Sequence, residues 1–165
     1  MKRISAVLGS LLLAFSFHAA AETRVGVVDL RQALFSSNDA QAFSEKLQKD
    51  FAADENKVRE AQEAARKLKD RLEKDGAMMN ESERTKLATE FQEKVQEFNF
   101  LKQRLDSTVA QRKQQFLEGA RPEVDAAVKE LLEEHDLDLI LPSEAVVYVK
   151  PEMNLTPQLL EKLNR

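Results

Sequence analysis

The chain has 165 residues, of which 33% are charged, and its formal net charge at pH 7 is −4. It contains no cysteine, which excludes a disulfide framework, a thiol nucleophile and a cysteine-ligated metal site. Tryptophan is absent and glycine and proline number only four each, so the composition favours long solvated helices over one compact globule.

The first residues have the pattern of a secretory signal peptide. Lys2 and Arg3 are basic, residues 4–17 are mostly apolar, and Ala19 and Ala21 form a small-residue cleavage site. A membrane anchor is the alternative, but the apolar run is shorter than the ~20 residues that a spanning helix needs. We therefore expect a signal peptide at residues 1–21 and an exported mature protein.

A short strand is predicted directly after the signal peptide. The run from Arg24 to Leu30 is rich in valine, and Asp29 near its end is suited to cap a brief helical turn through residues 31–35. We expect residues 22–39 to belong to a β-containing body.

The central segment, residues 40–118, has helical periodicity on both sides of one interruption. At about 100° per residue, its apolar side chains form a stripe roughly 100° wide before the interruption and one about 120° wide after it. The first stripe consists of Phe43, Leu47, Phe51, Val58, Ala61, Ala65, Leu68 and Leu72. The second consists of Leu87, Phe91, Val95, Phe98, Leu101, Leu105, Val109 and Phe116. Two such stripes predict an antiparallel coiled-coil hairpin whose remaining faces are solvated.

The interruption, LEKDGAMMNESERTKL, predicts the tip of this hairpin near residues 75–81. Gly76 stands where a helix C-cap is expected, and Asn80 with Glu83 three residues later is the pattern of a capping box. One helix should therefore end and another begin here.

The segment after the arm, residues 119–165, is predicted to complete the body. The runs LDLILP and AVVYVK are rich in β-formers and are separated by Ser143 and Glu144, which predicts two strands joined by a tight turn. A final helix is expected from Thr156, with Pro157 in its first turn.

Proline also bears on the helix that enters this segment. Pro122 lies close after Gly119, within an amphipathic pattern that continues to Glu134. Because proline removes an N–H and crowds the preceding turn, we expect a kink or a restart of the helix there.

Three short strands bury too little surface to be stable alone, so we expect several copies to pool them. The predicted fold class is α+β, with a small β body formed by oligomerisation and a long helical hairpin projecting from it. The residues expected in the oligomer body are Val25, Val27, Val28, Leu139, Ile140, Val146 and Val147.

Three runs carry a resemblance to a known family: VGVVDLRQALFSS, SERTKL and LDLILPSEAVVYVKPEMNLTPQLLEKLN. They resemble the Skp (OmpH-like) family of periplasmic chaperones, over essentially the whole mature chain. The resemblance implies a homotrimer in the periplasm whose three arms enclose a cavity. It also implies that the cavity holds unfolded outer-membrane β-barrel proteins without ATP.

Apolar side chains outside the stripes are the candidate client-binding residues. Phe100 lies about 200° around its helix from Phe98, away from the stripe. Met78 and Met79 lie at the tip, where flexible, polarizable side chains can adapt to varied partners. The structural alternative is that Phe100 packs on a neighbouring helix turn and the methionines merely fill the hairpin tip.

Basic residues gather on both sides of the tip. They are Arg66, Lys67, Lys69, Arg71, Lys74, Arg84 and Lys86. The resemblance implies a role in binding lipopolysaccharide or an anionic membrane surface, whereas a solvated helix face is the structural alternative.

The sequence has no motif that indicates catalysis. His135 stands among carboxylates, but neighbouring positions on a helix point in different directions, so this is a weak metal pattern. No phosphate-binding glycine loop, nucleophile elbow or H-E-x-x-H pattern occurs. We therefore expect no enzyme, cofactor or metal site.

Two non-enzymatic alternatives remain. One is a periplasmic coiled-coil adaptor or scaffold that docks a specific folded partner. The other is a nucleic-acid-binding arm, which the export signal and the balanced charge of residues 40–118 oppose, so no nucleic-acid partner is expected.

Overall fold

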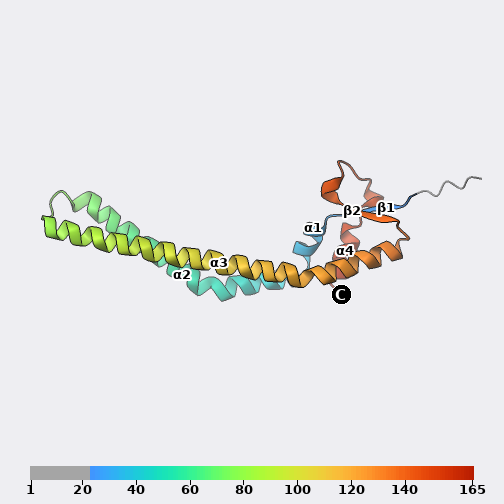
Figure 1. Ribbon diagram of the computed structural model, residues 1–165, viewed down its shortest axis with the longest axis horizontal. Helices are drawn as coiled ribbons and strands as arrows, with labels where there is room; N and C mark the ends of the chain where they lie inside the picture. Colours follow the sequence, from blue (N-terminus) through green and yellow to red (C-terminus); the bar gives the residue numbers. More distant parts are fainter. Residues whose placement is uncertain (1–22) are drawn as a thin grey trace, which may run out of the picture.

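The computed structural model describes residues 23–165, so the predicted signal peptide at 1–21 lies outside the described residues. These residues form a small body at one end and a long helical hairpin that projects from it (Figure 1). The elements are β1 (Val25–Val28), α1 (Leu30–Ser36), α2 (Asn38–Asp75), α3 (Glu81–Glu134), β2 (Leu139–Pro142), the 3-10 turns η1 (Ser143–Ala145) and η2 (Pro151–Met153), and α4 (Thr156–Leu163). The predicted α+β class with a projecting hairpin is confirmed, while the domain boundaries at 39/40 and 118/119 stay predictions.

Local signals explain where the two long helices begin and end. At the start of α3, Glu83 N donates to Asn80 Oδ1 and Asn80 N donates to Glu83 Oε2, which confirms the predicted capping box. Gly76 ends α2, with right-handed helical dihedrals in place of the left-handed ones common at such caps. A Cβ at Gly76 would clash with the carbonyl oxygen of Leu72, so this close approach requires glycine.

Among residues 23–165, no helix combines the length and apolar character that a membrane crossing requires.

The two predicted stripes meet between α2 and α3, in what we call the seam. Ala61, Ala65 and Leu87 are buried there, and the other stripe residues are half-buried. Near the body, the rings of Phe43 and Phe116 stack with centroids 4.4 Å apart and planes inclined by 15°. In Figure 1, α2 passes from one side of α3 to the other along the hairpin. The predicted antiparallel pairing is therefore confirmed.

Helix α3 runs without a break through Pro122, so the predicted restart of the helix is wrong. Pro122 leaves only the carbonyl of Glu118 without its helical N–H donor, and Glu118 and Pro122 are both exposed, so this carbonyl lies on the solvent side of the helix. Beyond it, Ala127 and Leu131 pack into the body core and hold the helix in place.

The sheet is smaller than the sequence predicts. β1 and β2 pair in parallel, with Val25 opposite Leu139. Residues 145–150 form no second strand, because Ser143–Ala145 is a 3-10 turn that leads the chain away from β2. A two-residue hairpin turn needs left-handed backbone, which glycine or asparagine adopts readily and a Ser-Glu pair does not. The predicted C-terminal β-hairpin is therefore wrong for this chain.

The body core lies where the strand pair meets α1, α3 and α4. It consists of Val28, Ala33, Ala127, Leu131, Leu155, Leu159 and Leu163. Asp29 caps α1 by accepting from Gln32 N at 2.8 Å, and its own N–H donates to Thr156 Oγ1 at 2.9 Å. Both the Asp29 cap and the start of α4 at Thr156 were predicted from sequence and are confirmed.

The stacked pair at the base of the hairpin yields a stability prediction. Phe116→Ala should lower the free energy of unfolding by about 2 kcal/mol, because it removes a half-buried ring and its aromatic partner contact. Urea unfolding followed by circular dichroism, at one fixed protein concentration, measures the change. Phe100→Ala is the matched control, since Phe100 is 63% exposed on the same helix and should cost under about 0.5 kcal/mol. Equal losses in the two variants would contradict this assignment of the seam.

Candidate functional site

The hairpin tip brings one predicted client-binding residue together with two of the predicted basic residues. A cavity of about 280 Å³, here called the tip cavity, lies beside the turn. It is lined by Arg71, Met79, Glu83, Lys86, Leu87 and Glu90. Met78 does not line this cavity and is 82% exposed, so the two methionines face different surroundings. The tip thus offers a largely charged, open cavity that Met79 and Leu87 also line, and beside it the highly exposed Met78.

Phe100 lies on α3 outside the seam. Its side chain is 63% exposed, whereas Phe98, two residues earlier, is half-buried. This exposure weighs against the structural alternative in which Phe100 packs on a neighbouring turn of the helix. An aromatic ring held in solvent on a rigid helix is available for contact with a partner.

The seven predicted basic residues are all exposed, but they do not form one positive surface. The ammonium of Lys69 lies 3.6 Å from the carboxylate of Glu73. Arg71 and Lys86 line the tip cavity together with the carboxylates of Glu83 and Glu90. Opposite charges at such short range reduce the local field that would attract an anion.

The predicted oligomer-body residues divide between the two faces of the strand pair. Val28 and Ile140 face the body core. Gly26 faces it too, since a Cβ there would come within 2.8 Å of the side chains of Leu137 and Leu155.

The opposite side of the strand pair is here called the open face. Because side chains alternate along a strand, Val25, Val27, Leu139 and Leu141 point to this side. Val27 is buried, while the other three are only half-buried by this chain. The strand pair therefore keeps an apolar surface that the helices do not cover.

The unpaired segment 146–150 continues this exposed apolar character. Val146 is half-buried, but Val147 is fully exposed and Tyr148 is 82% exposed. Tyr148 was not among the predicted site residues, although its run was recognised as β-rich.

Further exposed apolar residues at the root of the hairpin were missed by the sequence analysis. Phe35 is 56% exposed, and Leu30 and Leu117 line a groove of about 490 Å³ between α1 and α3. Leu117 directly follows the seam residue Phe116, so it lies about 100° off the stripe. The criterion that selected Phe100 would therefore also have selected Leu117.

The candidate site consists of exposed side chains, and the described residues include no candidate metal centre. Within 23–165, no group of three or more His, Asp or Glu side chains is placed to hold a metal ion. His135 is exposed at the end of α3, where its backbone N–H donates to the carbonyl of Leu131.

Comparison with known proteins agrees with this architecture. The family described as outer membrane protein (OmpH-like) matches residues 24–163. A Skp-like protein of Pseudomonas aeruginosa is 29% identical over 89% of this chain and 88% of its own length. The chaperone protein Skp of Vibrio cholerae is 25% identical over 96% of each chain. A solved OmpH-like protein of Caulobacter crescentus is 18% identical, covers 89% of this chain and 87% of its own, and has a TM-score of 0.63. Because the family match spans nearly the whole described chain, the protein belongs to the OmpH-like family.

Proposed function

We propose that the protein is a periplasmic chaperone that holds unfolded outer-membrane β-barrel proteins and prevents their aggregation without ATP. The observation that supports the proposal most is that the arm leaves apolar side chains exposed to solvent. α2 and α3 bury one narrow seam, and apolar side chains such as Phe100 and Met78 stay exposed on other faces. Membership of a family that includes chaperones named Skp supports the same function.

The arm suits weak and reversible binding. Exposed methionine adapts its shape to different partners, and an exposed aromatic ring contributes a large apolar contact area. A chaperone that uses no nucleotide must release its client spontaneously, so each contact has to be weak. Useful affinity then comes from several arms that act on one client at the same time.

We propose further that several copies form the working unit, and the family resemblance indicates a homotrimer. A two-stranded sheet is not stable by itself, and the open face leaves Val25, Leu139 and Leu141 half-exposed. Among the described residues, no strand pairs with the outer edge of β2. Residues 146–150 are rich in valine and unpaired, so they are suited to add a strand in contact with another copy.

We do not extend the proposal to lipopolysaccharide or an anionic membrane. The sequence resemblance implies this role for the basic residues near the tip. However, Glu83 and Glu90 share the tip cavity with Arg71 and Lys86, and their carboxylates weaken the attraction of this site for an anion. Catalysis is not proposed either.

An aggregation assay tests the chaperone function. The mature protein should suppress aggregation of several unrelated β-barrel membrane proteins diluted from urea, without nucleotide. The double variant Met78→Ser, Phe100→Ser should require roughly fivefold more protein for the same effect, corresponding to about 1 kcal/mol of lost apolar contact.

Gln96→Ser is the matched control, because Gln96 is exposed one helical turn before Phe100 and carries no comparable apolar surface. It should behave as the unmodified protein does. No suppression of aggregation, together with selective capture of one folded partner, would refute the chaperone and support the adaptor.

Light scattering tests the proposed self-association. The unmodified protein should have the mass of three chains, and Val147→Asp should shift the mass toward one chain at equal concentration. Val147 is fully exposed in the single chain, so the substitution should leave its fold intact, and the loss of mass should report on the interface. Lys150→Gln, in the same segment, should leave the mass unchanged. A single-chain mass for the unmodified protein would rule the proposal out.

A further inference from the structure

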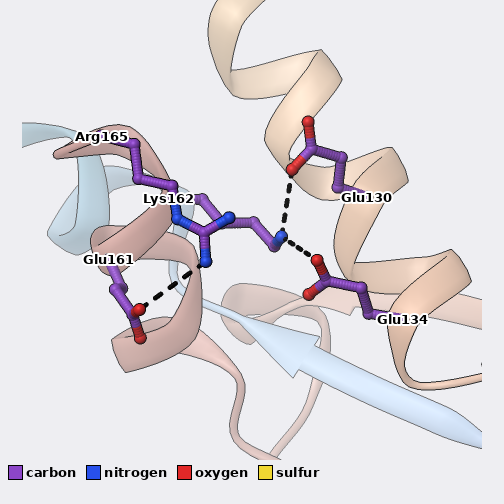
Figure 2. A network of polar contacts seen from close by, with 5 residues as sticks. All are labelled: Glu130, Glu134, Glu161, Lys162 and Arg165. Carbon is purple, nitrogen blue, oxygen red and sulfur yellow. Dashed lines mark hydrogen bonds and ion pairs between the residues drawn. The ribbon is translucent and has the colours of Figure 1, made fainter.

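The last turn of α4 holds an ion-pair network that joins it to α3 (Figure 2). The side chain of Lys162 is only 4% exposed. Its Nζ donates to Glu130 Oε2 at 3.0 Å and to Glu134 Oε1 at 2.7 Å. Glu130 and Glu134 lie one helical turn apart near the end of α3, so one buried ammonium bridges both turns. A buried lysine with two carboxylate acceptors is the arrangement that offsets the cost of burying its charge.

The same turn of α4 also contacts α2. Asn164 Oδ1 accepts a hydrogen bond of 2.8 Å from the backbone N–H of Asn38, the first residue of α2. Between these two polar contacts, Leu163 is buried in the body core. The end of α4 is therefore bonded to both long helices at the points where they enter the body.

The beginning of α4 is bonded to the sheet. Leu155 N donates to the carbonyl of Val27 at 2.8 Å, and Thr156 Oγ1 accepts from Asp29 N at 2.9 Å. These bonds tie the start of α4 to β1 and to the residue that follows it. α4 thus connects the strand pair at one end with the hairpin at the other.

Because α3 is one continuous helix from the body to the tip, contacts at its body end affect the position of the whole arm. From Glu130 to Glu81 the helix spans about 74 Å at 1.5 Å per residue. A change of 10° in the direction of α3 at the body would therefore move the tip by about 13 Å. A small change in the direction of α3 at the body therefore produces a large displacement of the hairpin tip.

We propose that the last turn of α4 is a latch that fixes the direction of the hairpin relative to the strand pair. Lys162 and Asn164 supply its two polar contacts. The proposal concerns the geometry of the arm, so it does not depend on the chaperone function.

The charged groups around Lys162 define how the latch responds to pH. Glu130 and Glu134 face it from α3, Glu161 and Arg165 lie on α4, and His135 is nearby. The hydrogen bond from Lys162 lowers the pKa of Glu134 below its ordinary value of 4.5, with smaller contributions from Arg165 and His135. The hydrogen bond with Glu134, followed by that with Glu130, raises the pKa of Lys162 above its ordinary value of 10.5.

The sign of each shift gives the pH range in which the latch holds. The carboxylate contribution is present above the ordinary pKa of 4.5 and is lost as pH falls through the lowered value. The ammonium contribution is present below 10.5 and is lost as pH rises through the raised value. The latch therefore holds throughout the neutral range and releases only in stronger acid or base.

Distance measurements between spin labels test the latch in the full mature protein. Because the chain has no cysteine, Ser107→Cys on α3 and Glu152→Cys in the body provide unique labelling sites, and both positions are exposed. Labelled chains are diluted into excess unlabelled chains, so that distances within one copy dominate. Pulsed electron spin resonance then reports the width of the distance distribution between arm and body.

Lys162→Met should widen this distribution about twofold, while circular dichroism and oligomer mass stay unchanged. Methionine keeps the apolar stem, and Glu130 and Glu134 are more than half exposed, so water can solvate them after the loss. Glu161→Gln is the matched control. It removes the exposed pair between Glu161 and Arg165 on the same turn and should leave the width unchanged.

If the Lys162→Met variant folds and its distance distribution is as narrow as that of the unmodified protein, the proposal is overturned. If that variant does not fold, Glu134→Gln decides, because Lys162 keeps its bond to Glu130 and the body stays folded. Its distribution should be intermediate in width, and an unchanged width would equally overturn the latch. In the unmodified protein the distribution should also widen in acid, as the pH falls through the lowered pKa of Glu134 and that carboxylate takes up a proton.

Discussion

The narrow seam between α2 and α3 is the interaction on which the rest of the structure depends. Each helix contributes one apolar stripe, with Ala61 and Ala65 buried along it and the stacked rings of Phe43 and Phe116 at its body end. Burial of one stripe leaves most of the circumference of each helix in solvent. The hairpin therefore stands away from the body (Figure 1), and side chains outside the stripe remain available to partners.

The body differs from the arm in having a small core and apolar surface that its own helices leave partly uncovered. Its core is small, and helices cover the strand pair on one side only. Val25, Leu139 and Leu141 on the open face are therefore only half-buried, and Val147 and Tyr148 are exposed. Self-association would cover these surfaces and leave the arms projecting from a shared base. Under the proposed function, the body would serve assembly and the arms would contact unfolded chains.

Local signals in the sequence predicted the elements well, because caps and periodic stripes act within a few residues. The capping box of Asn80 and Glu83 and the seam follow directly from such signals. Residues 145–150 show the limit of such local signals. Their β-forming residues predict a strand, but a strand also needs a partner to pair with, and the local sequence does not show whether one is present. The contacts of Lys162 join residues 32 and 28 positions apart, and no local pattern marks either pair. For Phe100 and Met78 the sequence predicted candidates, and the structure adds how exposed each one is.

Small-angle X-ray scattering, combined with mass determination on the same sample, tests the free-standing hairpin most directly. A compact globule of about 144 residues would have a radius of gyration near 15 Å, and one of three such chains would have about 22 Å. Projecting hairpins require a clearly larger radius at the measured mass, with a long tail in the distribution of interatomic distances. A radius that matches the compact value would mean that the helices fold back onto the sheet, which contradicts the account.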